Sequence, residues 1–132
     1  MIYSYKEITP AIKRPIIEII ILTKNNYTIY PVLIDSGADY CIFSTELAKD
    51  LGVELSKSKI SFRGIGKGKV MGRLAEIEMR ISNHMYKTKV LFTEIGKFGH
   101  GILGQHGFFD HFDVKLSYQK QTIEIEPLKI SN

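Results

Sequence analysis

The sequence predicts a single all-β domain, and three observations carry that prediction. The chain has 132 residues, 44% hydrophobic and 24% charged, which is enough for one domain with its own core. Its β-branched and aromatic residues gather in short runs separated by Gly, Asn and Ser. In one run, residues 75–81, apolar and charged residues alternate strictly, as they do in a half-buried strand.

Composition also limits the classes of partner and the cell compartment. The single cysteine, Cys41, cannot form an internal disulfide, so a cytoplasmic location is expected. The chain starts without the basic-then-apolar order of a signal peptide, and its longest apolar run, residues 16–22, contains Glu18. The net charge of +4 is modest and favours solubility. We therefore expect no membrane and no nucleic-acid partner.

The first third of the chain predicts an arm followed by a hairpin. Residues 1–14 contain Pro10 and are expected to form an N-terminal arm with room for an edge strand. Residues 15–22 and 28–34 predict two strands joined by a turn at Lys24-Asn25-Asn26. This hairpin delivers the chain to Asp35-Ser36-Gly37.

A short helix is expected next. Residues 40–43 predict a brief strand, and Ser44 suits the N-cap of a helix over residues 45–51. Gly52 suits the end of that helix.

The stretch from residue 57 to 72 has the most unusual composition of the chain. It contains four glycines, which together predict a mobile hairpin: Gly64, Gly66, Gly68 and Gly72. A phosphate-binding loop is excluded because Val70 stands where that motif needs Ser or Thr. A solvated surface loop remains the alternative.

The remainder predicts two hairpins with a helix between them. Residues 75–81 and 86–93 form the first, through a turn at Ser82-Asn83-His84. Residues 105–112 carry three phenylalanines at helical spacing and predict a short helix that packs them inward. Residues 113–118 and 121–126 predict the closing hairpin. The domain is thus expected to span 15–126, with a tail at 127–132.

The candidate catalytic residue is Asp35. A buried strand that ends in Asp-Ser-Gly places a carboxylate at a fixed point, and glycine permits the tight turn that follows. An ordinary strand-to-turn transition is the alternative, because Asp, Ser and Gly are common turn formers.

Three motifs together resemble the retropepsin-like aspartic proteases, in particular small prokaryotic members. The first is Leu33-Ile34-Asp35-Ser36-Gly37-Ala38. The second is the glycine-rich stretch 62–72, at the place of the family's flap. The third is Ile102-Leu103-Gly104 with the segment 105–114 after it. Order and spacing agree over about 15–126.

The resemblance implies a closed, single-lobed β fold with one or two short helices, active as a two-fold dimer. Peptide hydrolysis by this route needs two carboxylates that share one proton. Only one Asp-Ser-Gly is present, so Asp35 from each subunit would meet at the two-fold axis. Ser36 would bond across the dimer, and Gly37 would let the backbone approach the carboxylates.

The same resemblance implies an extended peptide substrate and a set of substrate-binding residues. The flap would close over the peptide, with Ile65 near its tip. The implied substrate-binding residues are Ala38, Arg63, Gly64, Ile65, Gly66, Ile102, Leu103 and Gly104. No cofactor or metal is expected, because the four histidines fall at no recognised ligand spacing.

Two other functions remain open. The chain could keep the fold only as a non-catalytic module that binds peptides or dimerises. A nucleic-acid binder would use the basic glycine-rich loop, but beyond Phe62 no aromatic residue is interleaved with the basic residues for stacking.

Overall fold

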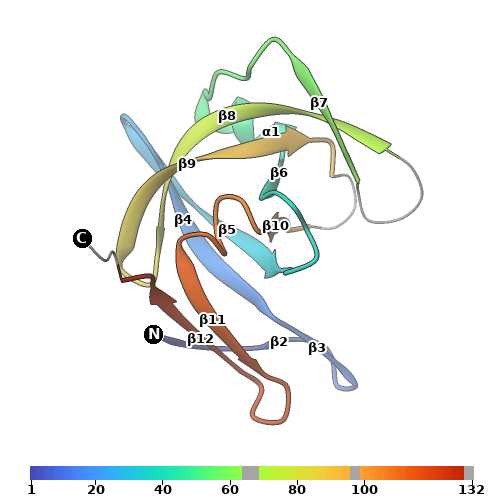
Figure 1. The fold of residues 1–132 in the computed structure, drawn as a ribbon, viewed down its shortest axis with the longest axis vertical. Coiled ribbons are helices and arrows are strands. Elements are labelled where there is room, and N and C mark those ends of the chain that lie inside the picture. The colour runs from blue at the N-terminus through green and yellow to red at the C-terminus, as the bar shows by residue number, and fades with distance from the viewer. Residues whose placement is uncertain (64–68, 96–98, 130–132) are drawn as a thin grey trace.

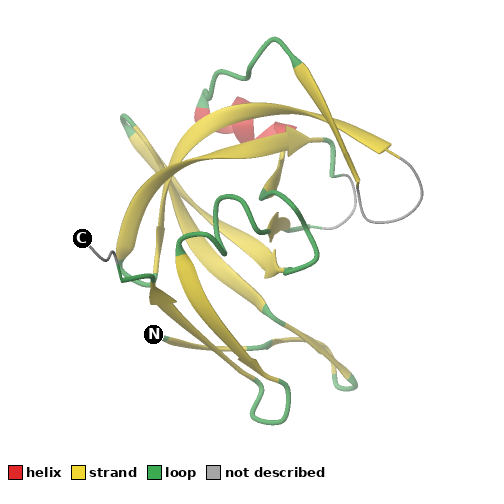
Figure 2. Ribbon diagram, viewed as in Figure 1, coloured by secondary structure: helices red, strands yellow, loops and turns green. Residues whose placement is uncertain are grey.

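The computed structural model of the chain is built almost entirely of strands. It describes residues 1–63, 69–95 and 99–129, and within these ranges there are twelve strands and one helix (Figures 1 and 2). The strands are β1 (Ile2–Ser4), β2 (Lys6–Thr9), β3 (Ile12–Arg14), β4 (Ile16–Thr23), β5 (Asn26–Ile34), β6 (Ile42–Ser44), β7 (Lys59–Arg63), β8 (Lys69–Ile81), β9 (His84–Thr93), β10 (Gly101–Leu103), β11 (Phe112–Ser117) and β12 (Thr122–Pro127), and the helix is α1 (Thr45–Leu51). The all-β prediction is confirmed.

The main sheet curls until it closes on itself. Its seven strands run in the order β4-β5-β10-β6-β9-β8-β7, and β4 also pairs with β8. Six strands therefore form a closed ring, and β7 lies outside it (Figure 1). Closing the ring leaves fewer unpaired strand edges than an open sheet would have.

The two expected hairpins of the main sheet are confirmed. β4 and β5 pair from Ile16↔Leu33 to Thr23↔Asn26. β8 and β9 meet at Ile81↔His84 through a two-residue turn, in which Ser82 and Asn83 have φ angles of 55° and 65°. Two consecutive positive φ angles make the type of turn whose twist matches paired strands.

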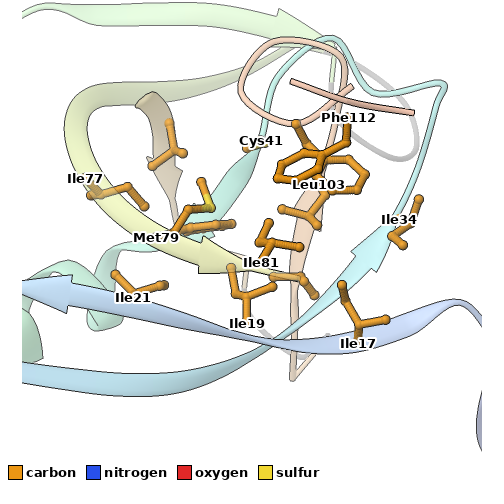
Figure 3. Packing of buried hydrophobic residues seen from close by; sticks show 14 of the residues in the cluster. Ile17, Ile19, Ile21, Ile34, Cys41, Ile77, Met79, Ile81, Leu103 and Phe112 are labelled. Carbon is orange, nitrogen blue, oxygen red and sulfur yellow. The ribbon is translucent and has the colours of Figure 1, made fainter. Parts of the chain in front are cut away.

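Alternation along the strands explains the core. Ile17, Ile19 and Ile21 of β4 point to one side, toward Met79 and Ile81 of β8 (Figure 3). All five are at most 3% exposed. Because successive side chains of a strand point to opposite faces, every second residue fills the inside of the ring.

The helix begins and ends where its sequence signals predict. The Ser44 hydroxyl accepts a hydrogen bond from the Glu46 N–H at 3.2 Å. Gly52 adopts a left-handed conformation with φ 68° and donates to the Lys49 carbonyl at 3.1 Å. Ala48 is 1% exposed and faces the core. No helix in the described part of the chain is long and apolar enough to cross a bilayer.

The predicted helix over residues 105–112 is wrong. The segment consists of turns, with Gly107 at φ 104°. Its backbone bonds follow no helical repeat: the Phe109 N–H donates five residues back to the Gly104 carbonyl at 3.2 Å, and the His111 N–H donates three residues back to the Phe108 carbonyl at 2.9 Å. The phenylalanines are nevertheless buried as expected, because Phe108 and Phe112 are 0% and 2% exposed. Their spacing in the sequence therefore indicates burial and not a helix.

The arm and the closing hairpin share a second sheet. β1 pairs with β12 from Ile2↔Glu124 to Ser4↔Thr122, and β12 pairs with β11. β2 and β3 form a separate two-stranded sheet. The brief strand expected at 40–43 is β6, two residues later, and Tyr40 makes only an isolated bridge to His106.

Replacing Phe43 by alanine tests the core. Phe43 is fully buried, with ring centroids 5.1 Å from Tyr30 and 6.1 Å from Phe92. Phe43→Ala leaves a cavity between those rings, so we expect the free energy of unfolding in urea to fall by about 3–5 kcal/mol. Tyr27→Ala, at a position 65% exposed, is the control and is expected to change it by about 0.5 kcal/mol or less. Equal losses for the two variants would contradict this account of the core.

Candidate active site

Asp35 stands at the carboxyl end of β5, and backbone bonds hold it from both sides. β5 pairs in parallel with β10, from Val32↔Gly101 to Ile34↔Leu103. The Asp35 N–H donates to the Leu103 carbonyl at 3.0 Å, and the Ile34 N–H donates to the Pro15 carbonyl at 3.0 Å. The carboxylate therefore leaves the sheet from a fixed backbone.

The turn after Asp35 orients its carboxylate. The Gly37 N–H donates to Asp35 Oδ1 at 2.9 Å, and the Ala38 N–H donates to the Asp35 carbonyl at 3.1 Å. A Cβ atom at Gly37 would lie 3.3 Å from Asp35 Oδ1, so glycine allows this close approach. Asp35 is half-buried, while Ser36 and Gly37 are exposed.

One carboxylate oxygen and the serine hydroxyl remain available. Within the described residues of this chain, neither Asp35 Oδ2 nor the Ser36 hydroxyl has a hydrogen-bond partner. A fixed carboxylate with one uncommitted oxygen is the arrangement that a general base or acid needs.

The segment 104–106 braces the turn from the outside. A Cβ atom at Gly104 would lie 2.6 Å from the Ala38 carbonyl oxygen and would collide with the Tyr40 carbonyl as well. The Gln105 N–H donates to Ala38 O at 2.8 Å, and its side-chain amide donates to Ser36 O at 3.0 Å. The His106 N–H donates to Asp39 O at 2.9 Å. Only a glycine at 104 permits this contact between two backbones.

The other expected substrate-binding residues lie in different environments. Ala38 is half-buried, whereas Ile102 and Leu103 are 3% and 0% exposed. The structure thus places the side chains of Ile102 and Leu103 in the packing beneath the turn, away from solvent. The backbone of Arg63 pairs with Lys69 at the end of the β7–β8 hairpin. Gly64, Ile65 and Gly66 lie outside the described residues.

A small apolar cluster joins that hairpin to the turn. Its buried members are Phe62 of β7, Ile102 of β10, Ile42 and Leu91, and Ala38 packs against it. The loop end of the β7–β8 hairpin and the strand that supports Asp35 therefore share one packed cluster.

Sequence reasoning missed Gln105, because the segment from 105 was assigned to a helix. Its exposed side chain bonds to the turn of Asp35 instead. The signal that could have found it is its position immediately after the Gly104 of the third motif.

Cys41 lies behind the site as an inert thiol. It is fully buried, and the Gly104 N–H points to its Sγ at 3.5 Å. Burial raises the pKa of the thiol to about 12, against the opposing effect of the Gly104 N–H and with a small contribution from the charge of Asp110. Cys41 is therefore part of the main core.

In the described part of the chain, neither a group of metal-ligating side chains nor the cavity beside α1 offers a competing centre. Among the described residues, no three His, Cys, Asp or Glu side chains lie close enough to hold a metal ion. A cavity of about 320 Å³ beside α1 is lined by Tyr30, Glu46, Asp50 and His100 among others, and Asp35 is not part of its lining. Among the described residues, Asp35 and Asp110 each accept a hydrogen bond from a backbone N–H, and of the two only Asp35 lies in the Asp-Ser-Gly turn at the end of β5, so Asp35 is the candidate catalytic residue.

A closed β ring that carries an Asp-Ser-Gly turn, braced by a hydrophobic-hydrophobic-Gly strand, defines a retropepsin-like aspartic protease fold. Residues 21–106, well over half of the chain, match the aspartyl protease family. The chain belongs to that family. Comparison with curated proteins gives no significant match.

Solved structures support the same fold. The EIAV protease in complex with the inhibitor HBY-793 is 27% identical, with a TM-score of 0.53, over 74% of this chain and 86% of that one. A retropepsin-like aspartic protease from Rickettsia conorii is 16% identical, with a TM-score of 0.63, over 93% and 86%. The retroviral protease-like domain of Ddi1 from Leishmania major is 14% identical, with a TM-score of 0.59, over 87% and 90%.

Gly104→Ala tests the close approach of the two backbones. The new methyl group would meet the Ala38 and Tyr40 carbonyls, so strands must shift, and we expect the free energy of unfolding to fall by about 3 kcal/mol or more. The control is Gly52→Ala, where no atom lies within 4 Å and only the left-handed φ opposes a side chain. That change is expected to cost about 1–2 kcal/mol in urea unfolding. A Gly104→Ala variant as stable as the wild type would show that the turn is not braced in this way.

Alkylation of Cys41 tests its burial. Because the pKa of the thiol is raised to about 12, almost no thiolate exists at about pH 8, and the sulfur is also out of contact with solvent. Iodoacetamide is expected to leave the folded protein unmodified for hours and to label it fully in guanidinium chloride, as read by mass spectrometry. Rapid labelling of the folded protein would mean that the core around Cys41 opens readily to solvent.

Proposed function

We propose that this chain is an aspartic endopeptidase that hydrolyses peptide bonds as a homodimer, with one Asp35 from each subunit in the active site. The observation that carries the proposal is the Asp35 carboxylate, which is half-buried, accepts from the Gly37 N–H at 2.9 Å, and has no partner at Oδ2 among the described residues. Membership of the aspartyl protease family supports it.

The chemistry requires a second carboxylate near the first. Two carboxylates a few ångströms apart cannot both stay ionised, so they share one proton. One then acts as general base toward the attacking water, and the other as general acid toward the carbonyl oxygen of the substrate. The chain has a single Asp-Ser-Gly, so a second copy must supply the partner across a two-fold axis. The exposed Ser36 hydroxyl would bond across that axis.

The substrate in this proposal is an extended peptide. It would lie between the turn of Asp35 and the β7–β8 hairpin, paired through its main chain. Residues 63–68 would act as a flap that closes over it, with Arg63, Gly64, Ile65 and Gly66 in contact with the peptide. Phe62 supports this arrangement, because it shares a buried cluster with Ile102, and Ala38 of the turn packs against that cluster. The protease domain would span 15–126, with an arm at 1–14 and a tail at 127–132.

Cleavage of a diverse peptide mixture, read by mass spectrometry from acid to neutral pH, tests the proposal. Asp35→Asn removes the ionisable group and keeps the shape of the side chain, so we expect cleavage to fall by about a thousandfold or more. Asp113→Asn, on the exposed face of β11, is the matched control and is expected to cut like the wild type.

Sedimentation of the same samples separates the remaining possibilities. A dimer that cleaves through Asp35 agrees with the proposal. A dimer in which neither wild type nor Asp35→Asn cuts at any pH would leave the fold in place and make a non-catalytic peptide-binding or dimerisation module the better description. Full cleavage by Asp35→Asn would contradict the assigned role of Asp35.

A further inference from the structure

We propose that Gln105 is a positioning residue for the Asp35 carboxylate, which it holds through the peptide group between Ser36 and Gly37. This inference rests on the proposed protease function. It adds to that function a side chain that does not touch the carboxylate itself.

The two hydrogen bonds that carry the inference meet on one peptide group. The Gln105 side-chain amide donates to the Ser36 carbonyl at 3.0 Å. The Gly37 N–H of that same peptide group donates to Asp35 Oδ1 at 2.9 Å. A peptide group is planar, so its C=O and N–H turn together. A donor that fixes the carbonyl therefore fixes the direction in which the N–H meets the carboxylate.

The same arrangement strengthens the second bond. A hydrogen bond accepted by the carbonyl polarises the peptide group and makes its N–H a better donor. Gln105 thus affects both the direction and the strength of the contact that holds Asp35 Oδ1. Without this hydrogen bond we expect the turn to be flexible. Ser36 and Gly37 are exposed, and a turn that contains glycine has little stiffness of its own.

Gln105 can do this because its own backbone is fixed. Its N–H donates to the Ala38 carbonyl at 2.8 Å, and its carbonyl accepts from the Asp110 N–H at 3.1 Å. Asp110 Oδ1 in turn accepts from the Gly107 N–H at 2.9 Å. The side chain therefore reaches Ser36 from a rigid base on the opposite side of the turn.

The side chain has no comparable part in the stability of the fold. Gln105 is exposed, and water can solvate the Ser36 carbonyl when the amide is removed. Truncation is therefore expected to disturb the orientation of Asp35 far more than the folding of the chain.

The test compares Gln105→Ala and Gln105→Glu with matched changes at Gln119, an exposed glutamine in the turn between β11 and β12. We expect Gln105→Ala to lower kcat by about three- to tenfold, with KM within twofold and the midpoint of thermal unfolding unchanged. Gln119→Ala and Gln119→Glu are expected to leave both kinetic constants as in the wild type.

Gln105→Glu adds a readout that a structural role would not produce. An ionised glutamate cannot donate to the Ser36 carbonyl, so kcat at neutral pH is expected to fall at least as far as in Gln105→Ala. Below about pH 4.3 the side chain is protonated and can donate again. The activity of Gln105→Glu relative to the wild type is therefore expected to rise as the pH falls through that value, while the ratio for Gln105→Ala stays flat.

The Gly37 amide resonance gives a measurement that needs no activity. Loss of the Gln105 donor is expected to move the Gly37 amide proton upfield and to speed its exchange with solvent, with no change in the Gln119 variants. If the wild type cleaves nothing but the resonance moves, the protease function fails and the link from Gln105 to Gly37 stands. If the wild type cleaves and Gln105→Ala changes neither kcat nor the resonance, or if the loss follows KM or thermal stability alone, the positioning role is overturned.

Discussion

The close approach of the Gly104 backbone to the carbonyls of Ala38 and Tyr40 is the constraint on which the candidate site depends. Without a side chain at that position, β10 can lie between β5 and β6, and residues 104–106 can bond to the turn that follows Asp35. Any larger residue would push the two backbones apart. The Asp35 carboxylate would then lose the fixed turn that presents it, although its own strand could remain intact.

Packing on both sides of that contact keeps the turn in place. The main core fills the ring below it, with Leu103 and Cys41 fully buried, and a second apolar cluster around Ile102 lies under Ala38. The acid therefore emerges where two apolar layers meet, half-buried and anchored by backbone donors. This gives a carboxylate that is rigid yet accessible, and backbone donors supply the orientation without adding another charged side chain.

One chain offers half of a site in this view. Within the described residues, Asp35 has an oxygen and Ser36 has a hydroxyl without a hydrogen-bond partner, and Asp35 is half-buried while Ser36 is exposed. The proposed dimer gives each of these groups a partner and supplies the second carboxylate that acid–base hydrolysis needs. The Gln105 side-chain amide binds the carbonyl of the peptide group whose N–H holds the Asp35 carboxylate. The turns at 104–111 therefore help to hold the Asp35 turn in place, although we assign no catalytic group to them.

Local patterns in the sequence determined the strands of the β4–β5, β8–β9 and β11–β12 hairpins, most turns and the helix. Alternation set the faces of residues 75–81, Ser44 and Gly52 set the bounds of α1, and Asp35-Ser36-Gly37 marked the candidate acid. These features depend on residues close together in the chain. Tertiary structure decided the rest: phenylalanines spaced as in a helix are buried by turns around Gly107, and β1 pairs with β12 some 120 residues away. The bond from Gln105 to Ser36 also joins residues far apart in sequence. Such contacts depend on how the closed ring brings distant segments together, and a pattern of neighbouring residues cannot predict that.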